Sequence, residues 1–239
     1  MRTNYSAFSG CGMLHRENQD RIYLSLQEDK RVVQSAEGSV LARRIVLAVF
    51  DGLGGEQCGE KAAELAARTL EANETMTLTA LCRTMNDAIC RHMQENGIRS
   101  MGAAAAIVRI ENGSITACNL GDSRIYLIRA QKMLQLSVDH VFFMGGRSRP
   151  VLTQYLGIPE QEMLLEPTLR ETALRSGDKL LVCSDGLPEV VDDAGILRIL
   201  NDTPMKDAAR VLYRAARESG GKDDISVIVC EVISGNGEQ

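Results

Sequence analysis

The sequence contains no tryptophan, and phenylalanine and tyrosine make up only 4% of its 239 residues. A tryptophan-based platform for sugars or nucleobases is therefore not expected. The net charge is -5, and lysine and arginine are dispersed rather than gathered in runs, which argues against a nucleic-acid-binding surface. No apolar run reaches the roughly eighteen residues of a membrane-crossing helix, and the N-terminus lacks an apolar stretch of signal-peptide length. We therefore expect a cytoplasmic protein that does not associate with membranes.

Histidine is also scarce, and cysteine lacks metal-binding spacing. The seven cysteines form an odd set without a CxxC pair, and several lie inside apolar stretches, so we interpret them as buried free thiols in a reducing compartment. Only His15, His92 and His140 are present, and none has zinc-type spacing to the cysteines. Any metal site is therefore expected to use oxygen ligands.

Apolar residues make up 44% of the chain and charged residues 25%, which is typical of a globular protein. No repeat or low-complexity linker divides the sequence, so we expect one domain, 1–239, with an ample core. Several predicted strands follow one another between the helical segments, which favours an α+β fold with antiparallel sheets covered by helices.

The apolar patterns predict the individual elements. The expected strands are 5–9, 21–26, 44–50, 103–110, 114–119, 124–129, 169–174, 179–183 and 225–233. The expected helices are 60–72, a second from 78 to a stop at Gly97, and a third with Thr203 as N-cap, Pro204 as first residue and Gly220 as stop.

Four aspartates stand where an apolar run meets a polar or glycine-rich turn. They are Asp51, Asp122, Asp185 and Asp223, beside the runs 45–50, 115–121, 180–184 and 225–230. Carboxylates at the rim of a core need compensating positive charge, and a metal cluster would supply it. Taken singly, Asp51 is equally well explained by a tight turn that caps the following helix, and Asp185 and Asp223 are more typical of turn aspartates. In Asp51-Gly52 the glycine would also let a backbone carbonyl approach a cation.

An oxygen-rich ligand set selects Mg²⁺ or Mn²⁺, and calcium is disfavoured because no DxDxDG loop occurs. Two such ions can share a water, lower its pKa and direct it at phosphorus. An aspartyl-phosphate enzyme is a poorer alternative, since Leu53 stands two residues after Asp51, where a second aspartate is usual. A metal nuclease could use the same ions, but its basic surface is missing.

An ordered set of segments closely resembles the metal-dependent protein Ser/Thr phosphatases of type 2C. The matching segments are 17–20, 50–55 leading into 59–63, 101–102, 119–126, 139–140, 152–157, 184–187 and 221–226. They follow the family's order and span nearly the whole chain. The resemblance implies a four-layer α-β-β-α sandwich of two antiparallel sheets flanked by helices, with two metals, and a third at a weaker site, in a cleft at one end.

The resemblance also implies roles for the residues at matching positions. Asp51 would bridge both metals, Asp185 and Asp223 would complete the first site, and the carbonyl of Gly52 would help hold the second. Asp20 would orient water on that second metal.

Asp122 would hold the weaker third metal together with Asp185. Leu53 replaces a histidine that some relatives carry, so a metal-bound water or His15 would have to protonate the leaving alkoxide.

Phosphate binding is where the sequence departs from the family. An arginine commonly stands three residues before the asparagine of the first motif, whereas this chain has His15 there, with Arg16 beside it. Both are candidates for phosphate binding, and a surface histidine is the alternative for His15. Asp224 replaces a usual asparagine, which either tightens cation binding or faces solvent. The flap segment 141–151 is shorter than in most relatives and is expected to alter substrate choice without removing the metals.

The predicted function is hydrolysis of phosphoserine and phosphothreonine in proteins by a monomer with Mg²⁺ or Mn²⁺, opposing a Ser/Thr kinase. A second hypothesis, motivated by His15 and the short flap, is a catalytically impaired module of the same fold that binds partners without turnover.

Overall fold

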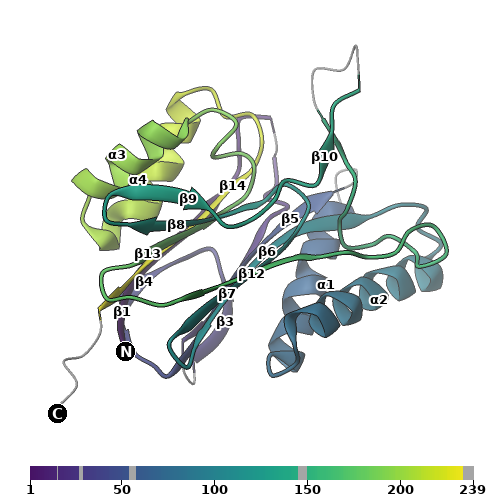
Figure 1. Cartoon of the computed structure of the whole chain (residues 1–239). Helices are drawn as coiled ribbons and strands as arrows, with labels where there is room; N and C mark the ends of the chain where they lie inside the picture. The colour runs from purple at the N-terminus through teal and green to yellow at the C-terminus, as the bar shows by residue number, and fades with distance from the viewer. Residues whose placement is uncertain (15, 27–28, 54–57, 145–149, 234–239) are drawn as a thin grey trace.

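Two six-stranded antiparallel sheets stack face to face in the computed structural model, which describes residues 1–14, 16–26, 29–53, 58–144 and 150–233 (Figure 1). The first sheet has the order β4 (Ser35–Leu41), β1 (Arg2–Gly10), β14 (Ile225–Ile233), β13 (Lys179–Cys183), β8 (Arg124–Arg129), β9 (Lys132–Gln135). The second has the order β12 (Thr168–Ala173), β7 (Ser114–Leu120), β6 (Gly102–Glu111), β5 (Arg44–Leu53), β2 (Arg21–Leu26), β3 (Asp29–Val33). A short hairpin of β10 (Val141–Phe142) and β11 (Val151–Leu152) projects from one end.

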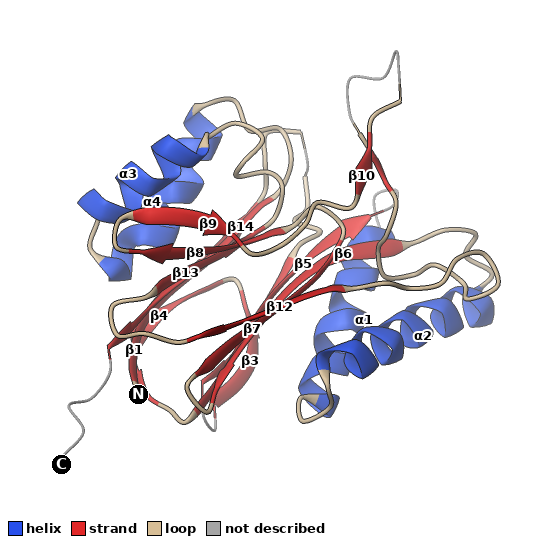
Figure 2. Cartoon of the chain, viewed as in Figure 1, coloured by secondary structure: helices blue, strands red, loops and turns tan. Residues whose placement is uncertain are grey.

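Each sheet carries a pair of helices on its outer face, as Figure 2 shows. Helices α1 (Cys58–Asn73) and α2 (Leu78–Asn96) cover the second sheet, and α3 (Asp193–Asp202) and α4 (Met205–Glu218) cover the first. This arrangement confirms the expected α-β-β-α sandwich. None of the helices within the described ranges combines the length and apolar character that a bilayer crossing requires.

The structure of β5 explains why the predicted strand 44–50 contains a continuous run of apolar residues. Ile45, Leu47 and Val49 face the other sheet, whereas Val46 and Phe50 face the helices, and all are fully buried. A strand covered on both faces needs apolar residues at every position. Burial of each large side chain stabilises the fold by about 1.5–3 kcal/mol. The same packing fixes where the strand ends, and therefore where Asp51 lies.

The strands at 21–26, 124–129, 179–183 and 225–233 have the predicted bounds, and the helices at 60–72 and 78–96 are confirmed with small shifts. Thr77 caps α2, and Gly97 ends it with a φ of 65°. The predicted start of the last helix is wrong. Thr203 is the C-cap of α3, and Pro204 is the N-cap of α4 without a side-chain cap.

Strands β3, β4 and β9 are absent from the sequence-based prediction because they lie at or next to sheet edges. Most side chains of β3 and β4 are exposed, so no alternation of apolar and polar residues marks them. All seven cysteines lie within the described ranges and are free thiols, as expected, but only four are buried, because Cys11, Cys58 and Cys90 are partly exposed.

Candidate metal centre

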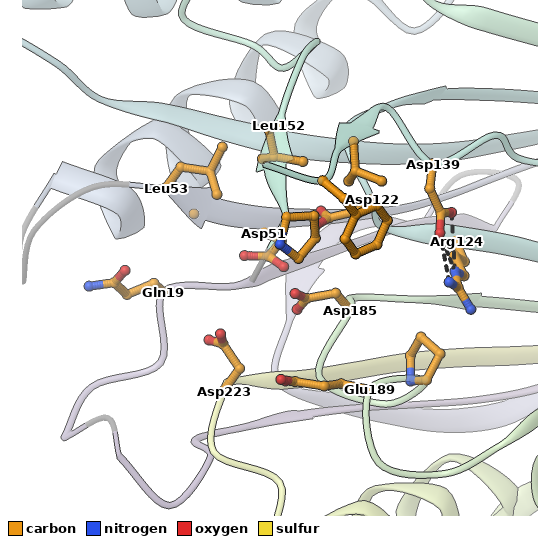
Figure 3. A pocket seen from close by; sticks show the side chains of 15 residues that line it. Gln19, Asp51, Leu53, Asp122, Arg124, Asp139, Leu152, Asp185, Glu189 and Asp223 are labelled. Carbon is orange, nitrogen blue, oxygen red and sulfur yellow. Dashed lines mark hydrogen bonds and ion pairs between the residues drawn. The ribbon is translucent and has the colours of Figure 1, made fainter. Parts of the chain in front are cut away.

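Three of the predicted metal ligands meet at one point. Asp51, Asp122 and Asp185 each offer a carboxylate oxygen, and these oxygens all lie within 4.8 Å of one another. Asp51 lies in β5, Asp122 follows β7 and Asp185 follows β13, so both sheets contribute. Figure 3 shows these side chains and Asp223, which lies just before β14, around a cavity of about 460 Å³. Residues more than a hundred positions apart in sequence therefore form one acidic site.

Close backbone packing explains the glycine after Asp51. A Cβ atom at Gly52 would lie 2.3 Å from the carbonyl oxygen of Gly59 and 2.7 Å from that of Gln19. Only glycine fits between α1 and the segment before β2, and its backbone lines the cavity. Gly52 is thus required by packing, and its backbone carbonyl is also available to bind a cation.

Gly121 holds the turn of Asp122 in a similar way. Its φ is 93°, and a Cβ atom there would lie 2.5 Å from the Cβ of Ala104. Two small residues therefore allow the turn to approach β6. His140 fastens the same turn, because its backbone N–H donates to the Gly121 carbonyl at 3.0 Å and its Nδ1 accepts from the Gly121 N–H at 3.1 Å.

Burial, followed by mutual repulsion, dominates the electrostatics of the cluster. Burial raises the pKa of both Asp51 and Asp185 well above the ordinary value of 3.8, and neighbouring carboxylates raise them further. Burial likewise raises the pKa of Asp122 to about 6, with a smaller contribution from Asp139. Oδ1 of Asp185 is buried without a hydrogen-bond partner among the described residues. Hard divalent cations fit this donor set, since they would offset the repulsion and satisfy the orphan oxygen.

Asp20 lies just behind the cluster rather than in the cavity wall. It is 2% exposed, and its charge raises the pKa of Asp51. Burial raises the pKa of Asp20 itself to about 7, although the hydroxyls of Ser226 and Ser184 lower it. Asp20 thus belongs to the same group of interacting carboxylates, and its predicted role in orienting water on a metal stays a prediction.

Asp224 is 2% exposed, so the alternative in which it faces solvent is wrong. Its Oδ1 accepts from the Gly12 N–H at 3.2 Å and its Oδ2 accepts from the Gln19 N–H at 2.8 Å. A carboxylate can accept at both positions, whereas an asparagine would present an NH₂ group to one of the two N–H donors. Asp224 therefore ties Gly12, and Gln19 directly before Asp20, to the start of β14.

Only one of the two phosphate-binding candidates lies within the described part of the chain. His15 lies outside the described residues. Arg16 is exposed and is not among the described residues that line the cavity. The cation among those lining residues is Arg124, and it is engaged: its Nε and Nη2 donate to Asp139 at 2.6–3.1 Å, and its Nη1 donates to the Tyr126 hydroxyl at 3.0 Å.

Glu189 is a cavity residue that the sequence-based prediction missed. Its N–H donates to the Asp185 carbonyl at 3.0 Å, which places it one helical turn after Asp185. Figure 3 shows its carboxylate beside Asp185 and Asp223. The sequence signal for Glu189 is its spacing of four residues from Asp185. This spacing brings the two side chains together only if the segment forms a helical turn, which the sequence did not indicate.

A sandwich of two antiparallel sheets with clustered carboxylates at one end defines the class of metal-dependent protein phosphatases of type 2C. The chain belongs to this class, and its residues 43–233 match the family described as Stage II sporulation protein E (SpoIIE).

Similar proteins bear phosphatase names. The serine/threonine protein phosphatase PstP of Mycobacterium tuberculosis (strain ATCC 25618 / H37Rv) is 28% identical over 250 residues, covering 96% of this chain and 45% of PstP. The chain therefore spans less than half the length of that relative. The protein phosphatase PhpP of Streptococcus pneumoniae serotype 2 (strain D39 / NCTC 7466) is 29% identical over 212 residues, covering 78% of this chain and 85% of PhpP.

Solved structures agree in fold. The crystal structure of the M. tuberculosis phosphatase PstP/Ppp superposes with a TM-score of 0.81 at 25% identity, covering 98% of this chain and 100% of the other. The catalytic domain of PstP in complex with two manganese ions gives a TM-score of 0.78 at 26% identity, covering 98% and 99%.

Proposed function

We propose that this chain hydrolyses phosphoserine and phosphothreonine in proteins with two Mg²⁺ or Mn²⁺ ions, and that a third ion binds at a weaker site. The observation that carries the proposal is the set of three carboxylate oxygens within 4.8 Å of one another at the end of the sandwich. The two manganese ions in the structure of the PstP catalytic domain support the choice of metal.

Asp51, the Gly52 carbonyl, Asp185 and Asp223 are the residues that would hold the two principal ions, with Asp122 at the weaker site. Bound there, the ions supply a nucleophilic water at neutral pH and neutralise the phosphoryl oxygens. Every one of these groups lines the same cavity, which supports the assignment.

The other residues in and beside the cavity would position water or support the site, and we assign none of them a direct part in the chemical step. Asp20, just behind Asp51, would orient the attacking water. The ion pair with Asp139 holds the Arg124 fork away from a substrate phosphate, so Arg124 acts as a structural cation. Leu53 lines the cavity and has no proton to give to the leaving alkoxide. His15 and Arg16 stay predictions for phosphate binding.

Phosphorylated proteins made by a Ser/Thr kinase would be the substrates. We further propose that residues 1–239 act as one monomeric catalytic unit in the cytoplasm. The seven free thiols support a reducing compartment.

A catalytically impaired module remains the second candidate, because the described cavity residues offer no cation that is free to take the phosphate. The full set of acidic side chains in one cavity favours the enzyme.

The deciding experiment is hydrolysis of a phosphothreonine peptide by the full chain with Mn²⁺, with EDTA, and with Asp51→Asn or Asp185→Asn. Turnover should require the metal and both aspartates. Asp202→Asn is a matched control, because Asp202 is an exposed residue at the end of α3. Mn²⁺ binding without turnover would instead support the impaired module.

A further inference from the structure

The projecting hairpin carries unusual apolar exposure. Two of the four phenylalanines of the chain, Phe142 and Phe143, are neighbours there and are 60% and 74% exposed. Met144, the next residue, is 48% exposed, whereas Phe50 is fully buried. Contiguous exposed apolar side chains at the mouth of a cavity are typical of a surface that binds something.

The strand register separates the two phenylalanines. Val141 pairs with Leu152, and both line the cavity that holds the carboxylates, whereas Phe142 pairs with Val151 and neither lines it. Side chains alternate along a strand, so Phe143 returns to the face of Val141 and also lines the cavity. One phenylalanine thus faces the cavity and its neighbour faces away.

The cavity lining consequently combines two kinds of residue. Carboxylates form one group. The apolar residues form the other, which we call the apolar wall, and they are Leu53, Val141, Phe143, Pro150 and Leu152. Figure 3 shows Leu53 and Leu152 across the cavity from Asp223 and Glu189.

The wall is held in place relative to the carboxylates. The Thr153 N–H donates to the His140 carbonyl at 2.8 Å, and the His140 N–H donates to the Gly121 carbonyl at 3.0 Å. The base of the hairpin is therefore fastened to the turn that carries Asp122.

We propose that the apolar wall selects phosphorylated segments with a large apolar residue next to the phosphoserine or phosphothreonine, and that Phe143 is the main specificity-determining residue. This inference rests on the proposed function. Adjacent residues of an extended chain are about 3.5 Å apart, and the wall lines the same cavity as the carboxylates, so the neighbours of a phosphoresidue bound at the carboxylates would lie in the cavity that the wall lines. Burial of a leucine against Phe143 removes apolar surface of both from water. An acidic neighbour is disfavoured by the surrounding carboxylates.

The test uses three peptides that share one phosphothreonine and differ only in its two neighbours on each side, which are leucine, serine or lysine. The full chain with Mn²⁺ should hydrolyse the leucine peptide with a kcat/KM about tenfold above that of the serine peptide, equivalent to about 1.4 kcal/mol. The difference should lie mainly in KM, because the wall contacts substrate and transition state alike.

Phe143→Ser should remove most of the preference for leucine, because KM for the leucine peptide should rise toward KM for the serine peptide. Phe142→Ser is the matched control, since it removes an equally large exposed side chain from the same hairpin but outside the cavity, and it should keep the preference.

Equal kcat/KM for the leucine and serine peptides, a best rate with lysine, or equal effects of the two variants would overturn the apolar wall while leaving the phosphatase assignment intact. Absence of turnover with every peptide and with free phosphothreonine would overturn the proposed function itself, and the wall with it.

Discussion

Two aspartates flank strand β13 and have opposite surroundings. Asp178, just before the strand, is 1% exposed, and its carboxylate accepts from Nε and Nη2 of Arg129 and from the Arg175 N–H, each at 2.7 Å. Asp185, just after the strand, faces other carboxylates and keeps one oxygen without a partner among the described residues. A carboxylate compensated by the protein contributes to stability, whereas one left uncompensated is arranged for a cation from outside.

The largest expected effect comes from removing the uncompensated charge. Asp185→Asn should lower kcat with a phosphothreonine peptide at least about a thousandfold, or ~4 kcal/mol of transition-state stabilisation. Because the substitution relieves repulsion among carboxylates, the unfolding temperature of the metal-free variant should not fall. Steady-state kinetics and calorimetry on the same preparation check both statements. A large loss of metal-free stability would show that Asp185 is a structural residue like Asp178.

The pH dependence of stability should expose the same repulsion. The pKa of Asp20 is raised from 3.8 to about 7 and that of Asp122 to about 6. The folded state therefore binds protons more tightly than the unfolded state, so the free energy of unfolding without divalent ions should fall as pH rises from about 4 to about 7. The loss from Asp20 alone is at most about 4 kcal/mol.

Thermal unfolding with EDTA across this pH window measures the slope. Mn²⁺ should raise the unfolding temperature more at pH 7.5 than at pH 5, because the carboxylates ionise fully only when a cation compensates them. A slope of the opposite sign would contradict the proposed electrostatics of the cluster.

Substitution of the compensated aspartate, Asp178, should lower stability and leave activity unchanged. Asp178→Asn leaves Arg129 without its carboxylate partner, and we expect a loss of about 2–3 kcal/mol in the free energy of unfolding, reduced from the fully buried case because Arg129 is 25% exposed. Activity per folded molecule should stay unchanged. Urea unfolding measures the loss of stability, and kinetics at urea concentrations below the unfolding transition measure the activity. A fall in kcat would contradict the purely structural role of Asp178.

The smallest effect concerns Asp224, which lies between these two extremes as a buried carboxylate that accepts two backbone N–H groups. Asp224→Asn can keep one of the two bonds and should cost about 1–2 kcal/mol. Amide hydrogen exchange at Gly12 and Gln19 should accelerate selectively. Unchanged protection at both amides would show that Gly12 and Gln19 are held by other contacts.

Much of this architecture was predictable from the sequence, because central strands are marked by uninterrupted apolar runs such as 45–50 and 180–183. The glycine and aspartate turns after them gave the acidic chemistry. Edge strands such as β3 and β4 were not predictable, since exposed strands lack an apolar period. The start of α4 was also misjudged, because Thr203 has good N-cap chemistry but is used to end α3.

The candidate site likewise has features that the sequence predicts and features that only the tertiary structure decides. Candidate ligands could be named from local patterns, because an aspartate at the end of an apolar strand is a feature of a few consecutive residues. Three outcomes depended on the packing of distant strands: the meeting of Asp51, Asp122 and Asp185, the burial of Asp224, and the turning of Phe143 toward the cavity but Phe142 away from it. Register and sheet stacking set these through contacts between residues up to two hundred positions apart, and no local pattern of residues encodes such contacts.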